Sequence, residues 1–328
     1  MSITMRQLEI FKAVVESGQV TKAAQGLFIT QSAVSLALNE MENQLGGPLF
    51  DRIGRRLELN DRGRYLLPLC REILDKVGDI DSLMNEKDGK FAGTLKLVAS
   101  STIGNYVLPY LITAFKSMHP DVHFNMRVSN TKSAEQLIMD RAVDLGFVEG
   151  EVNNEKIIIT KWFQDELVLI IRATQDAESE RVCDVTTDLK KYKWVMREPG
   201  SGTAQIFKSK LGKHATGLNV AMELGHTEAI KKAVEAGAGI GCLSSLTVCR
   251  AISRGWLQQI RLEGVDMKRQ LLIIQHKNKA RTRLMDEFLD FCFLLSQCSG
   301  GQACLSSPEN LQELVLQFCD AKTTYSPK

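Results

Sequence analysis

One segment near the start of the chain, TKAAQGLFITQSAVSLALNEMENQLG at 21–46, constrains the fold more than any other. Thr21 and Thr30 are suited to cap two consecutive helices, because a threonine hydroxyl accepts hydrogen bonds from first-turn amides. The small side chains of Ala23 and Ala24 let these helices approach closely. The spacing predicts a short helix, a tight turn and a longer helix that fits a DNA major groove.

The longer helix has two different faces. Apolar residues at helical spacing predict its buried face: Val34, Leu38, Met41 and Leu45. The opposite face carries groups that can hydrogen bond to base edges, and one apolar side chain that can contact a thymine methyl. The predicted DNA-reading residues are Thr30, Gln31, Ser32, Ser35, Leu36 and Asn39. The alternative is a helical hairpin with a solvated polar face, since short patterns of this kind also occur by chance.

The flanking segments favour DNA binding. Leu8, Phe11 and Val15 predict a preceding helix that completes a three-helix core. Downstream, alternating residues predict a β-hairpin with a basic tip that can contact phosphates through Arg52, Arg55 and Arg56. Residues 52–64 hold five arginines against two acidic residues, a surplus of three, whereas the whole chain carries only +2. The alternative for the hairpin alone is a solubilising charged turn.

Residues 3–64 resemble the winged helix-turn-helix of the LysR-type transcriptional regulators. The shared motifs are LEIF, TKAAQGLFITQSAVS, MENQLG and PLFDR, in the family's order. The resemblance implies binding to double-stranded DNA at a two-fold operator. The chain departs from the common pattern at Leu36 and Asn39, where many relatives have charged or longer polar side chains. The binding mode therefore carries over, and the operator sequence does not.

A long helix is predicted from Asp61 to about Asn85, with an apolar stripe at alternating three- and four-residue steps. Leu66 begins the stripe, and the predicted dimer seam consists of Leu69, Ile73, Val77, Ile80 and Met84. Pro68 removes one helical hydrogen bond, so we expect a bend there and place the seam after it. The alternative is packing against the downstream domain. The family resemblance, in which this is a dimerising linker helix, favours a homodimer or homotetramer.

Beyond this helix, short apolar strands alternate with helices, which predicts an α/β domain with helices on both faces of a sheet. The predicted strands are 94–99, 122–128, 144–148, 167–171, 194–197, 220–224, 239–243 and 271–275. The predicted fold class is an all-α winged helix-turn-helix N-terminal domain plus linker helix, followed by a two-lobed α/β periplasmic-binding-protein-like effector domain. The predicted divisions are a DNA-binding domain at 1–60, the linker helix at 61–88, the effector domain at 92–297 (lobe I at 92–164 and 267–297, lobe II at 165–266), and an extension of unknown role at 298–328.

Several predicted strands end in hydroxyl residues just before a helix. Helix amino termini carry unpaired amides and a positive dipole end, so such junctions suit a small anion, although each alone is more commonly an ordinary cap. The resemblance to the family's effector domain implies that the inducer lies between the lobes near these residues. The candidate effector-binding residues are Ser100, Ser101, Thr102, Thr131, Glu149, Ser201, Gly202 and Thr203.

Two departures bear on the effector. Relatives often have GSGTR where this chain has Ala204 after GSGT, so the sequence predicts an anion held by dipoles and hydroxyls alone. Glu149 would repel a fully ionised ligand unless it accepts a hydrogen bond or is itself protonated. STIGNY at 101–106 and AMELGHTEAIKKAV at 221–234 are similar to a sulfite-responsive branch of the family. This similarity implies an inorganic oxyanion such as sulfite; the alternative is another small anion or a carboxylate.

Composition and motifs disfavour other classes of protein. The chain has no apolar run of membrane-spanning length and no signal-peptide core, so we expect it in the cytoplasm, with no membrane partner. Its eight cysteines form no CxxC pair, and Pro120 separates His119 from His123, so we predict no metal site and no cofactor. GxGxxG, GK[ST], HExxH and GxSxG are absent, so we predict no catalytic residue. A protein that coats DNA nonspecifically is disfavoured because residues 1–90 hold twelve basic and thirteen acidic residues.

Overall fold

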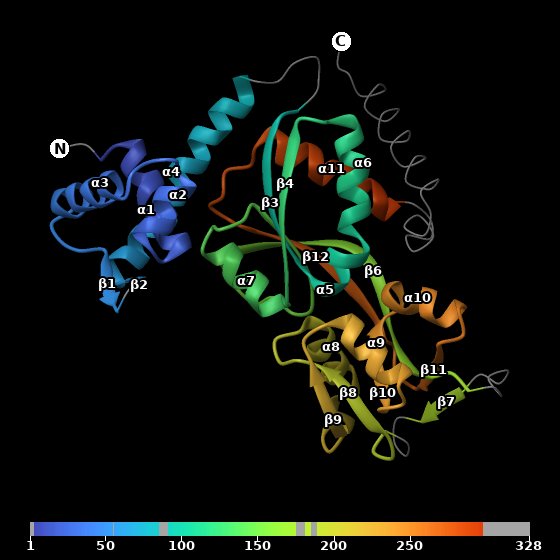
Figure 1. Ribbon diagram of the computed structural model, residues 1–328. Helices are drawn as coiled ribbons and strands as arrows, with labels where there is room; N and C mark the ends of the chain where they lie inside the picture. Colours follow the sequence, from blue (N-terminus) through green and yellow to red (C-terminus); the bar gives the residue numbers. More distant parts are fainter. Residues whose placement is uncertain (1–2, 55, 85–90, 175–180, 185–188, 298–328) are drawn as a thin grey trace, which may run out of the picture. The chain divides into compact units, whose positions relative to one another are not determined.

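The computed structural model of the protein describes residues 3–54, 56–84, 91–174, 181–184 and 189–297 (Figure 1). The chain divides into two compact units, Met1–Glu86 with Asp140–Ala142, and Lys87–Met139 with Val143–Lys328. The predicted extension at 298–328 lies outside the described residues.

The first unit is a helical domain with one hairpin. Its elements are α1 (Met5–Ser17), α2 (Val20–Gly26), α3 (Gln31–Gln44), β1 (Phe50–Ile53), β2 (Arg56–Leu59) and α4 (Asp61–Met84). Strands β1 and β2 pair antiparallel, with Phe50 opposite Leu59. The first three helices bury a common core, to which the predicted positions Phe11, Val34 and Met41 all contribute. The predicted helix-turn-helix and hairpin are therefore present.

The helix caps match the sequence only in part. Thr30 caps α3 as predicted, because its hydroxyl accepts from the Ala33 amide at 3.2 Å. The prediction that Thr21 caps α2 is wrong. Gln19 has extended backbone angles and is the N-cap, so α2 begins one residue before Thr21. The Thr21 hydroxyl instead donates to the side-chain oxygen of Gln31 at 3.4 Å, linking α2 to the start of α3.

Helix α4 is one helix from Asp61 to Met84, with Pro68 inside it. One face packs on the core of the first unit through Leu66, Leu67, Cys70 and Leu74. Leu66 therefore belongs to this face and not to the predicted stripe. The other face leaves four predicted seam residues 40–59% exposed, namely Leu69, Ile73, Val77 and Ile80. The side chain of Met84 lies outside the described residues.

The second unit is built on one mixed sheet with the strand order β4-β3-β5-β12-β6-β10-β8-β9, to which β11 and β7 are attached. The strands are β3 (Gly93–Ser100), β4 (Val122–Ser129), β5 (Leu145–Glu149), β6 (Ile157–Arg172), β7 (Arg181–Asp184), β8 (Lys193–Arg197), β9 (Asn219–Leu224), β10 (Ile240–Ser244), β11 (Leu257–Glu263) and β12 (Lys268–His276). Each of the eight predicted strands is present. The first half of β6, together with β7 and β11, was not predicted.

Helices cover both faces of this sheet (Figure 1). They are α5 (Ser101–Tyr106), α6 (Leu108–Met118), α7 (Thr131–Met139), α8 (Gly202–Leu211), the 3-10 helix η1 (Gly212–Ala215), α9 (Thr227–Glu235), α10 (Ser245–Ser253) and α11 (Arg283–Gln297). In the first lobe, α6 and α11 pack on one face of the sheet and α7 on the other. In the second lobe, α8 packs on one face, and α9 and α10 on the other.

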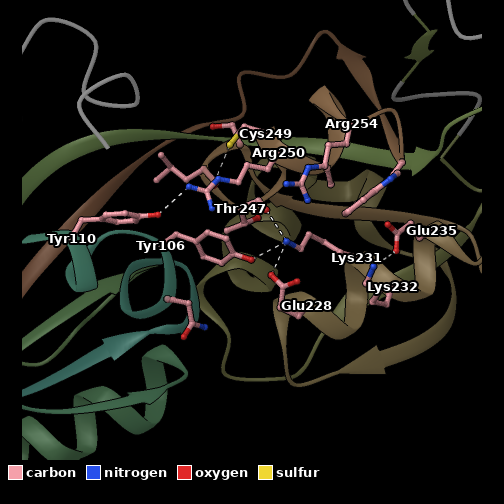
Figure 2. Close-up of a pocket in the computed structure, with 15 residues that line it drawn as sticks. Tyr106, Tyr110, Glu228, Lys231, Lys232, Glu235, Thr247, Cys249, Arg250 and Arg254 are labelled. Atoms are coloured by element: carbon pink, nitrogen blue, oxygen red, sulfur yellow. Dashed lines mark hydrogen bonds and ion pairs between the residues drawn. The ribbon is translucent and has the colours of Figure 1, made fainter. Parts of the chain in front are cut away.

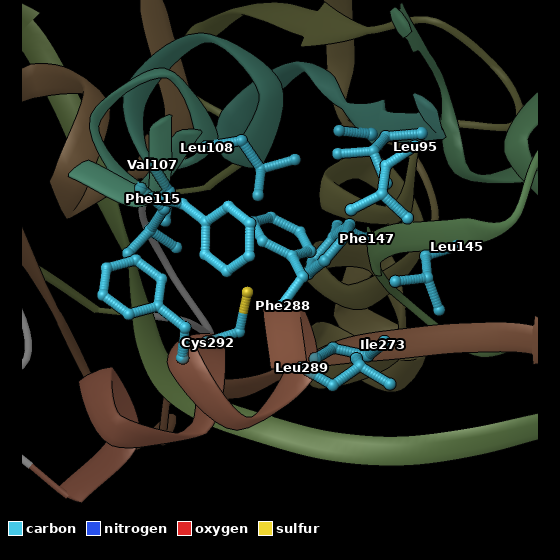
Figure 3. Close-up of a cluster of buried hydrophobic side chains, with 14 of the residues drawn as sticks. Leu95, Val107, Leu108, Phe115, Leu145, Phe147, Ile273, Phe288, Leu289 and Cys292 are labelled. Carbon is cyan, nitrogen blue, oxygen red and sulfur yellow. The ribbon is translucent and has the colours of Figure 1, made fainter. Parts of the chain in front are cut away.

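The first-lobe core is rich in aromatic rings (Figure 3). Phe115 of α6 meets Phe288 of α11 edge to face, with 5.1 Å between ring centroids. Phe147 of β5 packs against Trp162 of β6 at 5.2 Å. The Trp162 indole nitrogen donates to the Cys292 carbonyl at 2.7 Å, which satisfies its one polar group. This core fixes the strands whose ends carry the polar residues described below.

Strands β6 and β12 join the two lobes. The first part of β6 pairs with β12, and its last residues pair with β10 and β11 of the second lobe. Asp165 of β6 stands opposite Arg269 of β12, next to the transition from one set of pairings to the other. Among the described residues, no helix combines the length and hydropathy needed to cross a bilayer.

Candidate functional sites

The predicted DNA-reading face of α3 is open to solvent. Leu36 is 61% exposed, although it is apolar. Gln31, Ser32 and Asn39 are also exposed, whereas Ser35 is half-buried. The Thr30 and Ser32 hydroxyls lie 3.0 Å apart, within hydrogen-bonding distance. This face therefore combines accessible polar groups with one apolar contact, as base-edge recognition requires.

Sequence reasoning missed Phe28, in the turn between α2 and α3. Its side chain is 95% exposed, and its φ of 55° lies in the left-handed region that residues other than glycine rarely adopt. An exposed aromatic ring in a strained turn, next to a helix of DNA-reading character, is a candidate DNA contact. No clear sequence signal pointed to it, because Phe28 stands between Leu27 and Ile29 in an apolar turn.

The hairpin tip keeps its basic side chains accessible. Arg52 and Arg56 are exposed on β1 and β2, and neither has a carboxylate partner among the described residues. Arg62 and Arg64 are used within the unit: Arg62 donates to the Leu45 carbonyl, and Arg64 pairs with Asp61. Arg55 lies outside the described residues. The tip arginines therefore differ from the helix arginines in being available to phosphates.

The second unit buries a group of polar residues where its lobes meet, here called the interlobe polar cluster. It contains all eight predicted effector residues, each of them buried: Ser100, Ser101, Thr102, Thr131, Glu149, Ser201, Gly202 and Thr203. These residues lie at the starts of α5, α7 and α8 and at the end of β5. Strand ends and helix starts that are distant in the sequence thus converge, as expected at the carboxyl edge of parallel strands.

Glu149 stands at the centre of the cluster. Its carboxylate accepts hydrogen bonds from the hydroxyls of Ser100, Thr102 and Thr203, the last two at 3.3 Å. Its backbone carbonyl accepts from the Thr131 hydroxyl at 2.6 Å. A buried carboxylate is tolerated only when hydrogen bonds or charges compensate it. The hydroxyls of four predicted residues are therefore all donated to Glu149.

Two buried arginines join the cluster, and the sequence analysis missed both. Arg197 ends β8, and its guanidinium donates to the Ser101 hydroxyl at 3.2 Å and to the Thr227 hydroxyl at 3.4 Å. It also pairs with Glu198 at 2.8 Å. The cluster therefore contains guanidinium groups in addition to the predicted dipoles and hydroxyls, and how an anion would be held stays a prediction. Ala204 supplies no guanidinium, whereas Arg197 on β8 and Arg269 on β12 do.

Arg269 is the second of these arginines. Its Nε donates to Asp165 at 2.7 Å, its Nη1 donates to the Thr203 hydroxyl at 3.0 Å, and Nη1 lies 3.9 Å from Glu149. Asp165 in turn accepts from the Ser244 hydroxyl at 2.8 Å. The Nη2 of Arg269 is buried and has no hydrogen-bond partner among the described residues. A buried donor without an acceptor raises the free energy of the folded protein, so a hydrogen-bond acceptor placed next to Nη2 would lower it.

Glycines let the two lobes touch backbone to backbone. A Cβ at Gly202, the first residue of α8, would lie 1.7 Å from the Glu149 carbonyl oxygen and 2.6 Å from the Thr131 hydroxyl. Gly150 has a φ of +108°, and a Cβ there would lie 2.8 Å from the Cα of Gly202. No other residue type fits at these two positions without moving the backbone. The amino terminus of α8 is thereby held against the end of β5.

Cys70, Cys242, Cys249 and Cys292 are free thiols, and burial controls their reactivity. Burial raises the pKa of Cys70 to about 11, and it also raises the pKa of Cys242 and of Cys292. Cys242 lies near Arg269 and Asp165 of the cluster, and the field of Arg269 only partly opposes the effect of burial on its pKa. These thiols stay protonated at neutral pH, and a protonated thiol is a poor nucleophile. Cys249, by contrast, is exposed.

Comparisons with known proteins match both units. A family model described as "Bacterial regulatory helix-turn-helix protein, lysR family" matches residues 5–64, and one described as "LysR substrate binding domain" matches residues 88–293. The chain is 38% identical over 292 residues to a protein of Escherichia coli (strain K12) described as an uncharacterized HTH-type transcriptional regulator, YeiE, covering 89% of this chain and 98% of that one. It is 29% identical over 290 residues to the HTH-type transcriptional activator CmpR of Synechocystis, covering 88% and 95%.

Solved structures agree on the fold. A full-length OxyR variant of Pseudomonas aeruginosa aligns with a TM-score of 0.68 at 17% identity, covering 91% of this chain and 99% of that chain. Full-length CbnR in complex with its target DNA aligns with a TM-score of 0.63 at 21% identity, covering 88% and 98%. At these identities the likeness supports the architecture, and the chemistry of the sites rests on this chain's own residues.

Proposed function

Because this chain belongs to the LysR family of bacterial DNA-binding transcriptional regulators, we propose that it senses a small oxyanion through the interlobe polar cluster. The chain is therefore a regulator with an effector-binding domain, and not an enzyme. We extend the proposal to the identity of the effector, the DNA contacts and the oligomeric state. Sulfite is the first candidate, and a small carboxylate is the alternative.

For DNA, the proposal places α3 in the major groove and the hairpin tip on the phosphates. The exposed face from Gln31 to Asn39 reads base edges, and Arg52 and Arg56 supply affinity that depends on salt. The apolar face of α4 that begins at Leu69 pairs with a second copy, because an exposed stripe of this kind is poorly stable in water. A homodimer, or a homotetramer built from it, then presents two α3 helices to a two-fold operator in the cytoplasm.

For the effector, the unpartnered Nη2 of Arg269 carries the argument. It is a buried cationic donor beside Thr203, and the amino terminus of α8 adds amides and a positive dipole end next to it. Ser101 and Ser201 are buried nearby, and neither hydroxyl donates to Glu149. An oxyanion carries several acceptor oxygens around one central atom. It can therefore accept hydrogen bonds from Arg269, from the first-turn amides of α8 and from a serine hydroxyl at the same time.

Charge selects among oxyanions. The most deeply buried charges of the cluster, Arg197 and Arg269 against Asp165 and Glu149, sum to zero. A fully ionised anion would therefore add uncompensated negative charge beside Glu149. Hydrogensulfite still carries a proton, whereas sulfate at neutral pH does not. A carboxylate has about four acceptor positions, three of which are used here, and Oε2 accepts from Ser100 only. That open position can take the proton of hydrogensulfite.

Calorimetric titration of the full-length protein tests this proposal. Sulfite, sulfate and acetate are compared at pH 6 and pH 8. We expect sulfite to bind, to bind more weakly at pH 8 as its protonated form declines, and sulfate to bind much more weakly at both pH values. Heat with acetate alone would support the carboxylate alternative. No heat with any of the three anions would overturn the oxyanion proposal and leave the family assignment intact.

A further inference from the structure

A cavity of about 630 Å³ lies at the carboxyl end of α5 (Figure 2). The first lobe contributes Tyr106, at the end of α5, and Tyr110 of α6. The second lobe contributes residues of α9 and α10, and Trp256. Ligand cavities in proteins commonly enclose about 300–1,000 Å³. None of the predicted effector residues lines this cavity, so it is separate from the interlobe polar cluster.

Four cations line the cavity, and two of them lack an acidic partner. Lys231 pairs with Glu228, and Lys232 pairs with Glu235. Arg250 and Arg254 lie one helical turn apart, at the end of α10 and just after it, and neither has a carboxylate partner among the described residues. Arg250 donates only to the neutral hydroxyl of Tyr110, at 3.1 Å. The lining therefore carries a surplus of two positive charges, four against two.

Trp256 gives the cavity an exposed aromatic surface. The indole is 46% exposed, and both Lys232 and Arg254 lie over it, each 5.1 Å from the ring centroid. On the opposite wall, the Tyr106 ring has Lys231 over it at 5.2 Å, and the Tyr106 hydroxyl accepts from Lys231 at 2.9 Å. Aromatic rings with cations on them present apolar surface and positive charge together. An inorganic ion would use only the charge.

We propose that this cavity is a binding site for a small aromatic anion, a carboxylate or a phosphate ester. Arg250 and Arg254 hold the anionic group, because guanidinium groups bind such oxygens with two N–H donors each. The aromatic body of the ligand lies between Tyr106 and Trp256. The ligand contacts both lobes at once and adds to the two hydrogen bonds that already join them here, Arg250 to Tyr110 and Lys231 to Tyr106.

The chain carries its own reporter for this site. It has three tryptophans, and the other two are buried, with indole nitrogens bonded to the carbonyls of Cys292 and Leu189. Change in the emission of full-length protein therefore reports mainly on Trp256. Phenyl phosphate and benzoate are the anionic probes, and benzyl alcohol is the neutral control of similar shape. We expect saturable quenching by phenyl phosphate, by benzoate, or by both, and none by benzyl alcohol.

Variants identify the groups responsible. Trp256→Phe removes the signal but keeps binding, which calorimetry measures. Arg254→Gln and Arg250→Gln each weaken binding by roughly tenfold, the usual effect of losing one charge-assisted hydrogen-bonding group. Lys210→Gln, an exposed cation in α8 outside the cavity, leaves binding unchanged. Circular dichroism confirms that each variant is folded.

The contrary outcomes are equally definite. No saturable signal and no heat with either anion would overturn the proposal, and so would equal binding of benzyl alcohol. Equal binding of inorganic phosphate would overturn the aromatic part of it. Unchanged affinity in a folded Arg250→Gln, Arg254→Gln double variant would exclude this cavity as the place of binding.

Discussion

The interlobe polar cluster and the aromatic cavity each contain two arginines, but in opposite environments. Arg197 and Arg269 are 3% and 5% exposed and have carboxylate partners at 2.8 and 2.7 Å. Arg250 and Arg254 are exposed and contact only a phenol and an indole ring. A buried charge needs a partner of opposite charge or hydrogen bonds, whereas an exposed charge is stabilised by water and does not need one. The cluster is therefore suited to selecting by charge state, and the cavity to attracting by charge and aromatic contact.

The contrast is sharpest for stability. Asp165→Ala removes the hydrogen-bonded ion-pair partner of the buried Arg269 and leaves only Glu149, 3.9 Å from Nη1, which is expected to lower the free energy of unfolding by about 3–5 kcal/mol. Arg254→Gln should change it by less than about 0.5 kcal/mol, because its surroundings are wet. Urea unfolding of both variants measures the difference. Equal costs for the two substitutions would show that the environments are not as different as their burial indicates.

Thiol chemistry separates the same two regions. Cys242 lies beside the cluster with a raised pKa, whereas Cys249 lines the cavity and is exposed. Iodoacetamide at pH 8 should modify Cys249 much faster than Cys242, because Cys249 is accessible to the reagent, whereas burial shields Cys242 and raises its pKa. Peptide mapping by mass spectrometry gives the rates.

Cys70 should resemble Cys242 in that experiment, since its pKa is about 11. A buried thiol with a raised pKa also makes folding pH-dependent. The unfolded thiol ionises first, so its contribution to stability is complete below about pH 9 and is lost between pH 9 and 11. Rapid alkylation of Cys242 in the folded protein would contradict the closed packing around the cluster.

Glu149→Gln tests the proposed proton selectivity. The amide has a donor where the carboxylate has only acceptors, so a fully ionised oxyanion becomes acceptable beside it. Sulfate affinity is expected to rise and the fall in sulfite affinity at pH 8 to diminish, each by roughly tenfold. Glu151→Gln is the matched control, because it removes the same charge two residues away at an exposed position. An unchanged order of anions in Glu149→Gln would remove Glu149 from effector recognition.

The smallest predicted effect comes from relieving the backbone strain at Phe28. The charges of the interlobe polar cluster are compensated by partners, whereas no interaction among the described residues compensates this strain. Phe28→Asn places a residue that tolerates positive φ in the turn before α3, which should raise the free energy of unfolding by about 0.5–1 kcal/mol. The same change removes the exposed ring and is expected to weaken operator binding. Thermal unfolding and a mobility-shift titration measure the two quantities. If stability rises and DNA affinity stays the same, the ring is not a DNA contact.

Local patterns in the sequence predict the first unit well. Val34, Leu38 and Met41 are buried as their helical spacing requires, and Thr30 caps α3. The prediction at Thr21 was wrong because backbone angles decide which residue is the N-cap. Gln19 has the extended backbone angles of an N-cap, although its side chain makes no capping hydrogen bond. A residue type suited to a cap does not by itself fix where a helix begins.

The effector region shows the limit of such reasoning. Hydroxyl residues at strand ends carry a local signal, and the predicted ones converge on Glu149. Arg269 carries none, because it is a single basic residue in a strand and its partner Asp165 is 104 positions away in the sequence. Only the pairing of β6 with β12 brings them opposite each other. The departure at Ala204 gave no indication of Arg197 and Arg269, because a missing arginine at one position says nothing about arginines from other strands.

Helix α5 is six residues long, about 9 Å at the usual rise per residue. Its first residues, Ser101 and Thr102, belong to the interlobe polar cluster, and its last, Tyr106, lines the aromatic cavity. One short helix thus has its first residues in the cluster and its last residue in the cavity. Any coupling of binding through this helix is reciprocal. If a ligand in the cavity changes the affinity of the cluster for its anion by some factor, the anion changes the affinity of the cavity for that ligand by the same factor.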